Sequence, residues 1–338
     1  MIAVDAELRR RLQEFASAHV GGDAVTVTDI EDMPGHSGVS YGFTIRRREG
    51  GSERSDRYVL RLAPPGVRLE GPADVVRQAR LLRSLAGTGV PVPWVAWHGD
   101  DPQWFGRPYF VMVRVPGSTL VVRDQPPENA PDTEGFRHRA QQAIDALLVL
   151  HRLDWRAHAP ERTPVGLSEA VTHWDRFWKR SADPELVRAA PALRDELLAR
   201  VPAAPRIGLT HGDFQWANLL YDGERLAAVL DWELAGVGAV LNDLGWLMVF
   251  SDPESWAHTS LWASTPPPDL IAETYADRAG FEVREVAWHR ALAGYTFGII
   301  AGFNLMLHRR GKRVDPHYEM MVPSIPRLIE RAAEVLGA

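Results

Sequence analysis

The residues best suited to chemistry stand together in Leu209–Asp231, which reads LTHGDFQWANLLYDGERLAAVLD. The stretch opens with a short apolar segment that predicts a β-strand. It continues with His211, Gly212 and Asp213 on a tight connection. A carboxylate in such a position can accept or orient the proton of a hydroxyl group.

The segment after this connection predicts a β-hairpin. Asn218 precedes the apolar run Leu219–Tyr221. A turn signal at Asp222–Gly223 separates that run from a second one, Leu226–Leu230, which leads to Asp231. A hairpin would place Asn218 and Asp231 at the outer ends of paired strands, and so at one edge.

Two oxygen-bearing side chains at one edge suit a hard cation. Magnesium prefers octahedral oxygen coordination and takes one or two carboxylates, with water and substrate phosphates in the other positions. We therefore expect Asn218 and Asp231 to bind the metal and Asp213 to act on the proton. Any one of these residues alone would more often be a turn cap, so the inference depends on their joint spacing.

This spacing resembles that of a protein-kinase catalytic loop, with Asp231 in the place of the second metal-binding Asp. His-Gly-Asp instead of His-Arg-Asp is similar to the aminoglycoside phosphotransferase and choline kinase branch of the protein-kinase-like fold. The continuation through Asp231–Glu233 and Asn242–Trp246 resembles most the kinase-like domains that some acyl-CoA dehydrogenases carry. The resemblance implies ATP, or alternatively GTP, as phosphoryl donor, and Mg²⁺ as the metal.

The resemblance also implies an α+β, bilobal fold. Residues 1–115 would form an N-terminal nucleotide-binding lobe with an antiparallel sheet and one main helix, and residues 116–338 a mostly helical catalytic and substrate lobe. A chain of 338 residues is long enough for two such bodies. The composition changes from strand-like to helix-like after Met112–Gly117, which is consistent with a boundary there.

Composition excludes several classes of partner and site. The net charge of −6 argues against nucleic acid, which is bound by basic surfaces. The chain has no Cys, which excludes disulfides and thiolate metal sites. The first twenty residues lack the apolar run of a signal peptide, so a cytoplasmic location is expected. Ala291–Leu307 is apolar, but a buried helix is favoured over a membrane span.

The N-terminal region predicts a helix and three strands, over Asp5–His19, Val25–Ile30, Ser40–Arg46 and Arg57–Leu62. An antiparallel sheet is the simplest arrangement of these strands. The loop between the first two strands contains Gly35, His36, Ser37 and Gly38. Glycines let the backbone approach phosphate oxygens, so we expect a nucleotide-covering loop, with an ordinary hairpin loop as the alternative.

Arg61 stands where the kinase pattern has the Lys that reaches the α- and β-phosphates. A guanidinium keeps its charge and can hold two phosphate oxygens, while a plain surface Arg is the alternative. The acidic partner of this cation should lie on a helix over Pro72–Leu85, but Gln78 occupies the expected position. Glu70 or Asp74 could replace it.

Strands over Val90–Trp97 and Arg107–Val113 are expected to complete the N-terminal region. The segment that follows resembles the hinge between kinase lobes. Met112, Val113 and Val115 would then bind the adenine, with hydrogen bonds to backbone groups of Val113 and Val115.

The remainder of the chain predicts mainly helices. An exposed loop is expected over Arg123–Thr133, and helices over Phe136–Leu153, Thr172–Arg180, Leu193–Val201, Asp243–Phe250, Pro268–Ala279, Val283–Leu307 and Ile325–Leu336. His151 is expected to be a hydrogen-bonded residue at a helix end. Asp243 could either cap its helix or brace the catalytic loop through backbone amides.

The expected function is phosphoryl transfer to the hydroxyl group of a small molecule. An antibiotic kinase acting on an aminoglycoside or macrolide is one alternative, and a non-catalytic nucleotide-binding module is another. Carboxylates such as Asp252, Glu254 and Glu273 would suit a cationic acceptor. The twelve Trp would suit a partly apolar one, unless they form the core. The sequence indicates neither the acceptor nor the oligomeric state.

Overall fold

The computed structural model describes residues 6–33, 39–120, 133–257 and 265–338. The chain forms two compact units, each treated separately below. The N-terminal unit comprises Met1–Gly117 together with Ala227–Leu234, and the C-terminal unit comprises Ser118–Leu226 and Ala235–Ala338. The return of Ala227–Leu234 to the N-terminal unit has no counterpart in the division at residues 115 and 116 expected from the sequence.

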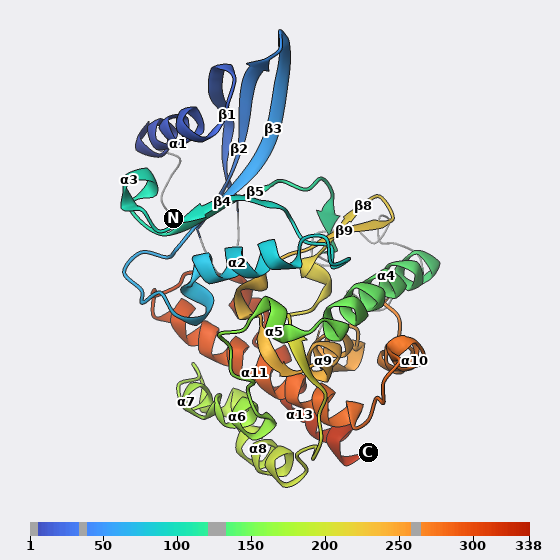
Figure 1. Ribbon diagram of the computed structural model, residues 1–338. Coiled ribbons are helices and arrows are strands. Elements are labelled where there is room, and N and C mark those ends of the chain that lie inside the picture. Colours follow the sequence, from blue (N-terminus) through green and yellow to red (C-terminus); the bar gives the residue numbers. More distant parts are fainter. Residues whose placement is uncertain (1–5, 34–38, 121–132, 258–264) are drawn as a thin grey trace. The chain divides into compact units, whose positions relative to one another are not determined.

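The N-terminal unit is built on the expected antiparallel sheet, with the strand order β1-β2-β3-β5-β4 (Figure 1). Its strands are β1 (Asp23–Met33), β2 (Val39–Glu49), β3 (Ser52–Leu62), β4 (Val95–Gly99) and β5 (Tyr109–Val113). Strand β4 begins later than predicted, at Val95, because Pro91 and Pro93 have no N–H to donate to a neighbouring strand. The α+β class inferred from the sequence is confirmed.

Helix α1 (Ala6–His19) covers one face of this sheet with an apolar stripe. Leu12 and Phe15 are fully buried, and their spacing places them on the same side of the helix. The ring of Phe15 contacts the rings of Trp97 and Tyr109 edge to face, at centroid distances of 5.7 and 5.5 Å. These aromatic contacts fix α1 to the sheet.

Helix α2 (Val75–Leu85) starts three residues later than the predicted Pro72. A 3₁₀ turn, η1 (Gly71–Ala73), precedes it, and Asp74 caps the helix by accepting a hydrogen bond from the N–H of Arg77 at 2.9 Å. An Asp at an N-cap position satisfies a backbone donor that the helix leaves open. The short helix α3 (Pro102–Phe105) completes the helices of this unit.

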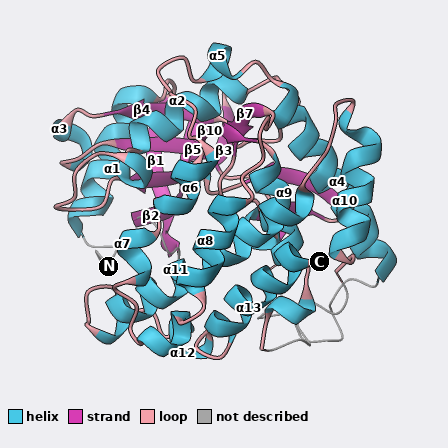
Figure 2. Ribbon diagram, turned by 90° about the horizontal axis from the view of Figure 1, so that it is seen from below, coloured by secondary structure: helices cyan, strands magenta, loops and turns pink. Residues whose placement is uncertain are grey.

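The C-terminal unit is mainly helical, as expected (Figure 2). Its helices are α4 (Thr133–Arg152), α5 (Trp155–His158), α6 (Leu167–Thr172), α7 (Asp175–Trp178), α8 (Ala190–Ala199), α9 (Leu241–Val249), α10 (Pro268–Ala279), α11 (Val286–Arg309), α12 (His317–Met320) and α13 (Ser324–Gly337). The prediction of one helix over Thr172–Arg180 is wrong, since α6 ends at Thr172. The short helix α7 is instead held by Arg194, which donates to Asp175 at 2.7 and 2.8 Å.

The chain also forms two small sheets. Strands β7 (Ile207–Thr210) and β10 (Gly236–Ala239) pair antiparallel. The other sheet has the order β6-β8-β9, with β6 (Ser118–Thr119), β8 (Leu219–Asp222) and β9 (Arg225–Val229). The last two strands form the predicted hairpin, with Gly223 at a φ of +60° in its turn.

Helix α11 forms the centre of the C-terminal unit. By length and composition it is apolar enough to cross a membrane, but 72% of its apolar window is buried within the protein. Gly294 and Gly298 face α13 closely, since a Cβ at Gly298 would lie 2.7 Å from the side chain of Ile329. The glycines in this apolar stretch therefore let two helices approach closely, and the expected buried helix is confirmed.

Gly245 of α9 meets α11 at a similarly close crossing. A Cβ at this position would overlap the carbonyl oxygen of His289 and lie 2.7 Å from its carbonyl carbon. Backbone atoms cannot yield as a flexible side chain can, so the helices would have to move apart.

We expect Gly245→Ala to lower the free energy of unfolding by about 1–3 kcal/mol, because it forces α9 away from α11. Gly166 provides the matched control, since a Cβ there meets nothing within 4 Å and its φ is −70°. Urea denaturation of both variants measures the effect. Equal stabilities of the two variants would contradict the proposed steric role of Gly245.

Burial lowers the pKa of His289 to about 4, from an ordinary value of 6.5. The unfolded chain therefore binds a proton between these values while the folded chain does not, so stability falls as the pH drops from 6.5 to 4. We expect this residue to cost up to about 3 kcal/mol at pH 4. In urea denaturation at pH 7 and pH 4, the free energy of unfolding should fall less for His289→Gln than for wild type. An identical decrease in both proteins would refute this.

Candidate active site

The residues expected to form the catalytic loop follow directly after strand β7. His211 is fully buried, and its Nδ1 accepts a hydrogen bond from the N–H of Asp213 at 3.2 Å. Gly212 has a φ of +85°, a conformation that favours glycine. The ring of His211 thus closes the turn from inside, while Asp213 is only partly buried.

Asp243 fixes the backbone of this loop. Its carboxylate is completely buried and accepts hydrogen bonds from the N–H of His211 at 2.7 Å and from the N–H of Gly212 at 2.8 Å. Of the two roles considered from the sequence, the structure shows the brace. A buried carboxylate with charge-assisted hydrogen bonds to amides holds a loop more firmly than neutral contacts would.

His151 and Tyr275 extend this buried network. His151 is 1% exposed, and its Nε2 lies 3.3 Å from Asp243 Oδ2, while its Nδ1 lies 2.7 Å from the Tyr275 hydroxyl. Burial and the nearby charge of Asp243 raise the pKa of Tyr275, so its hydroxyl keeps its proton. The prediction that His151 is a hydrogen-bonded residue at a helix end is confirmed.

Asn218 holds the carboxylate of Asp213 in place. Its Nδ2 donates to the Asp213 carbonyl oxygen and to Asp213 Oδ2, both at 2.8 Å. Gln215 adds a hydrogen bond from its Nε2 to Asp213 Oδ1 at 3.1 Å. Since the amide NH₂ group of Asn218 faces Asp213, its Oδ1 points the other way and has the chemistry of a metal ligand.

Two apolar residues in the same loop were not singled out from the sequence. Phe214 and Trp216 are 1% and 0% exposed. Trp216 also donates from Nε1 to the Ser251 hydroxyl at 3.0 Å. These buried side chains alternate with Asp213 and Gln215, which are less buried, so the loop is anchored on one side and presents its carboxylate on the other.

The N-terminal unit contains the other charged group. Arg61 of β3 lies 2.7 Å from Glu233 Oε2 and 3.2 Å from Asp231 Oδ1, both through Nη2. Asp231 has a φ of +63°, which is strained for a residue with a side chain, and strain of this kind is commonly found at functional sites. The cation and carboxylate identified from the sequence are therefore in direct contact.

The acidic partner of Arg61 is not where the sequence suggested. Glu70 pairs with Arg68 at 2.9 Å, and Asp74 caps α2. Gln78 is buried and donates to the carbonyl oxygen of Pro72 at 2.8 Å. Glu233 occupies the place expected for Glu70 or Asp74, from a segment distant in the sequence.

The structure describes only some of the residues expected to contact the nucleotide. Gly35, His36, Ser37 and Gly38 lie outside the described residues, although the strands on either side pair as expected. Met112 and Val113 end strand β5, and Val115 follows it. The N–H of Val113 already donates to the carbonyl oxygen of Trp94 at 2.8 Å, so a base would have to use other backbone groups of Val113 and Val115.

Magnesium requires no dense ligand cluster. Across the four described stretches, no group of three or more His, Cys, Asp or Glu could hold a metal ion alone. One carboxylate and one amide oxygen, completed by water and phosphates, nevertheless fit Mg²⁺. Within the N-terminal unit, Asp231 offers a carboxylate oxygen, with 29% of its side chain exposed, and within the C-terminal unit Asn218 offers an amide oxygen.

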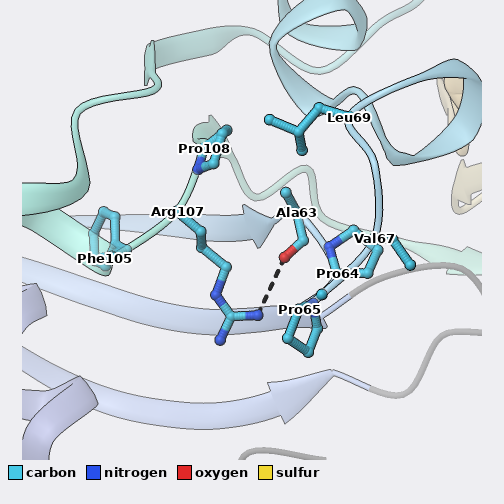
Figure 3. A pocket seen from close by; sticks show the side chains of 10 residues that line it. Ala63, Pro64, Pro65, Val67, Leu69, Phe105, Arg107 and Pro108 are labelled. Atoms are coloured by element: carbon cyan, nitrogen blue, oxygen red, sulfur yellow. Dashed lines mark hydrogen bonds between the residues drawn. The ribbon is translucent and has the colours of Figure 1, made fainter.

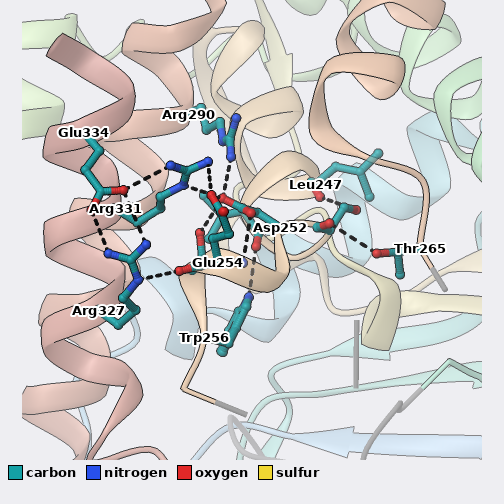
Figure 4. Close-up of polar contacts among 12 residues, drawn as sticks. Leu247, Asp252, Glu254, Trp256, Thr265, Arg290, Arg327, Arg331 and Glu334 are labelled. Carbon is teal, nitrogen blue, oxygen red and sulfur yellow. Dashed lines mark hydrogen bonds and ion pairs between the residues drawn. The ribbon is translucent and has the colours of Figure 1, made fainter. Parts of the chain in front are cut away.

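Two of the three carboxylates considered for binding an acceptor, Asp252 and Glu254, have structural partners, whereas Glu273 is exposed. Asp252 is 3% exposed and contacts Arg290, Arg331 and the Ser255 hydroxyl (Figure 4). Burial alone would raise the pKa of Asp252, but these neighbours, Arg290 foremost, outweigh it and lower the pKa. Glu254 is 2.6 Å from Arg331. Both carboxylates are therefore compensated within the protein.

Several of the tryptophans considered for an apolar acceptor belong to the core. The buried ones are Trp216, Trp232, Trp246, Trp256 and Trp288, each at most 7% exposed. Trp262 lies outside the described residues. Twelve Trp in the composition therefore do not by themselves indicate an apolar binding site.

A pocket of roughly 460 Å³ lies in the N-terminal unit, away from these residues. It is formed by the loop after β3 and by the segment leading into β5, where Arg107 donates to the carbonyl oxygen of Ala63 at 3.1 Å (Figure 3). None of the expected site residues lines it.

The chain is similar to proteins of known family. The model of the phosphotransferase enzyme family matches residues 40–292. The chain is 29% identical over 198 residues to acyl-CoA dehydrogenase family member 10 of Mus musculus, covering 56% of this chain and 18% of that protein. It is 28% identical over 256 residues to family member 11 of Rattus norvegicus, covering 73% and 31%. The chain thus spans less than a third of either relative.

Solved structures show the same fold. A candidate aminoglycoside phosphotransferase of Ralstonia eutropha has a TM-score of 0.74 at 21% identity, covering 96% of this chain and 98% of the other. The aminoglycoside phosphotransferase APH(4)-Ia, in a ternary complex with ADP and hygromycin B, has a TM-score of 0.64 at 16% identity, covering 98% of each chain. With the family match over residues 40–292, the chain belongs to the phosphotransferase enzyme family.

Proposed function

We propose that this protein transfers the γ-phosphoryl group of ATP to a hydroxyl group of a small molecule, with Mg²⁺. The observation that carries the proposal is the carboxylate of Asp213, held by Asn218 on a loop that Asp243 braces. Membership of the phosphotransferase family supports it. The complex of APH(4)-Ia with ADP supports an adenine nucleotide, and GTP remains the alternative donor.

Each residue has a role that suits phosphoryl transfer, which depends on positioning and on charge stabilisation. Asp213 would orient the acceptor hydroxyl and take its proton. Asn218 and Asp231 would hold Mg²⁺, whose chemistry is to neutralise charge on the phosphates. Arg61 would donate hydrogen bonds from the N–H groups of its guanidinium to the phosphates of the nucleotide.

The remaining nucleotide contacts are proposed on the sequence pattern alone. Gly35–Gly38 would cover the phosphates with backbone N–H groups. The segment with Met112, Val113 and Val115 would receive the adenine. The N–H of Val113 is engaged by Trp94, which limits the base to the other main-chain groups.

Asp213→Asn should reduce Mg²⁺-dependent ATP turnover by about 10²–10⁴-fold, because the amide cannot accept the proton of the acceptor. Asp231→Asn should raise the Mg²⁺ concentration needed for half-maximal turnover. Asp222→Asn, on the exposed turn of the same hairpin, is the control and should stay near wild type. Coupled measurement of ADP release tests all three. Near wild-type turnover by Asp213→Asn would disprove the proposed mechanism.

The proposed acceptor is a hydroxylated acyl compound. Two observations support this choice over a polycationic aminoglycoside. Asp252 and Glu254, which the sequence suggested for a cationic acceptor, are already paired with Arg290 and Arg331. The two relatives compared above carry the name of acyl-CoA dehydrogenases, although the chain matches only part of each.

A panel of hydroxyacyl-CoA thioesters, aminoglycosides and macrolides separates these acceptors. We expect ATP-dependent gain of one phosphoryl group by a hydroxyacyl thioester and by none of the antibiotics, because Asp252 and Glu254 are already paired with arginines. Mass spectrometry of each acceptor after incubation measures it, with the Asp213→Asn variant as blank. Phosphorylation of an aminoglycoside or macrolide instead would establish the antibiotic-kinase alternative.

A further inference from the structure

The contacts of Arg61 suggest a residue that the kinase-like pattern does not include. One nitrogen, Nη2, serves two carboxylates, at 2.7 Å from Glu233 and 3.2 Å from Asp231. The side chains of Arg61 and Glu233 are each 13% exposed, whereas that of Asp231 is 29% exposed. The shorter contact in the drier surroundings is the stronger one, so Glu233 holds Arg61 more firmly than Asp231 does.

Glu233 is itself fixed by its neighbours. Arg77 of α2 donates from Nη2 to the Glu233 carbonyl oxygen at 2.7 Å and to the Gly71 carbonyl oxygen at 3.1 Å. The adjacent Trp232 is 3% exposed and donates from Nε1 to the Val229 carbonyl oxygen at 2.8 Å. Helix α2 therefore fixes the main chain of Glu233 through an arginine, and the carboxylate of Glu233 fixes Arg61.

The carboxylates of Asp231 and Glu233 differ in their proposed roles, since only Asp231 is proposed to bind the metal. A divalent cation at Asp231 would compete with Arg61 for the same oxygen atoms. Glu233 gives Arg61 a partner that the metal does not require, so Arg61 can keep its place when Asp231 is engaged. Without Glu233, Arg61 would draw on Asp231 alone of these two acids and oppose the binding of the metal.

We infer that Glu233 is the positioning residue for Arg61, orienting its guanidinium toward the phosphates of a bound nucleotide. Glu233 thus performs the task that the sequence pattern assigns to an acid on the helix over Pro72–Leu85, where Gln78 stands. This inference rests on the proposed function. It extends that function by making nucleotide affinity and Mg²⁺ requirement depend jointly on Glu233.

The test measures nucleotide binding rather than turnover. Fluorescent N-methylanthraniloyl-ADP is titrated into the full chain at several Mg²⁺ concentrations, using wild type, Glu233→Gln and the control Glu70→Gln. Glu233→Gln should bind about tenfold more weakly and need more Mg²⁺, because its neutral amide holds Arg61 less well. Glu70→Gln should match wild type, since Glu70 is exposed and pairs with Arg68.

A double variant separates positioning from general stability. In an Arg61→Met background, Glu233→Gln should cause no further weakening, whereas a merely structural role of Glu233 would weaken binding again. Should Glu233→Gln fail to fold, Glu233→Asp decides, with an expected intermediate affinity. If the Glu233 variants bind the nucleotide with wild-type affinity and wild-type Mg²⁺ dependence, the role of Glu233 is overturned while the proposed function stands. Absence of nucleotide binding by wild type would overturn the proposed function as well.

Discussion

The candidate active site depends on one buried carboxylate that accepts two backbone N–H groups. Asp243 reaches the catalytic loop from α9 and fixes His211 and Gly212, so the direction in which Asp213 leaves the turn is set from beneath. Burying a charge is costly unless it is hydrogen-bonded, and here the amides compensate for that cost. The buried charge of Asp243 thus makes the loop that carries Asp213 rigid.

A second group of charges lies in the N-terminal unit, and it differs from the first in being partly exposed to solvent. Arg61, Asp231 and Glu233 carry one positive and two negative charges, and Asp231 is the most exposed of the three. Such a group has a net negative charge and an accessible carboxylate, which suits a cation brought by a ligand. The first group therefore consists of buried hydrogen bonds, and the second keeps one more exposed carboxylate, that of Asp231.

Local patterns in the sequence were enough to predict most strands, most helices, and the loop with Asp213 and Asn218. These features arise from residues within a few positions of one another, where turn signals and apolar periodicity act. The identity of the acid that pairs with Arg61 could not be predicted, because Glu233 lies 172 positions away. The start of α2 was misjudged since Asp74 caps the helix, which only the observed hydrogen bond shows. Composition could not distinguish a tryptophan in a binding pocket from one in the core, and only the structure shows which tryptophans are buried.

The return of Ala227–Leu234 to the N-terminal unit has a consequence for how the chain is made. During synthesis the first 117 residues emerge from the ribosome long before Ala227–Leu234. The unit to which they belong is complete only after Leu234 has emerged. The five strands of the sheet are all present by Val113, but the partner acids of Arg61 are still missing while roughly half of the other unit is synthesised. Non-local closure of this kind is slow, so the two units are expected to mature together rather than one after the other.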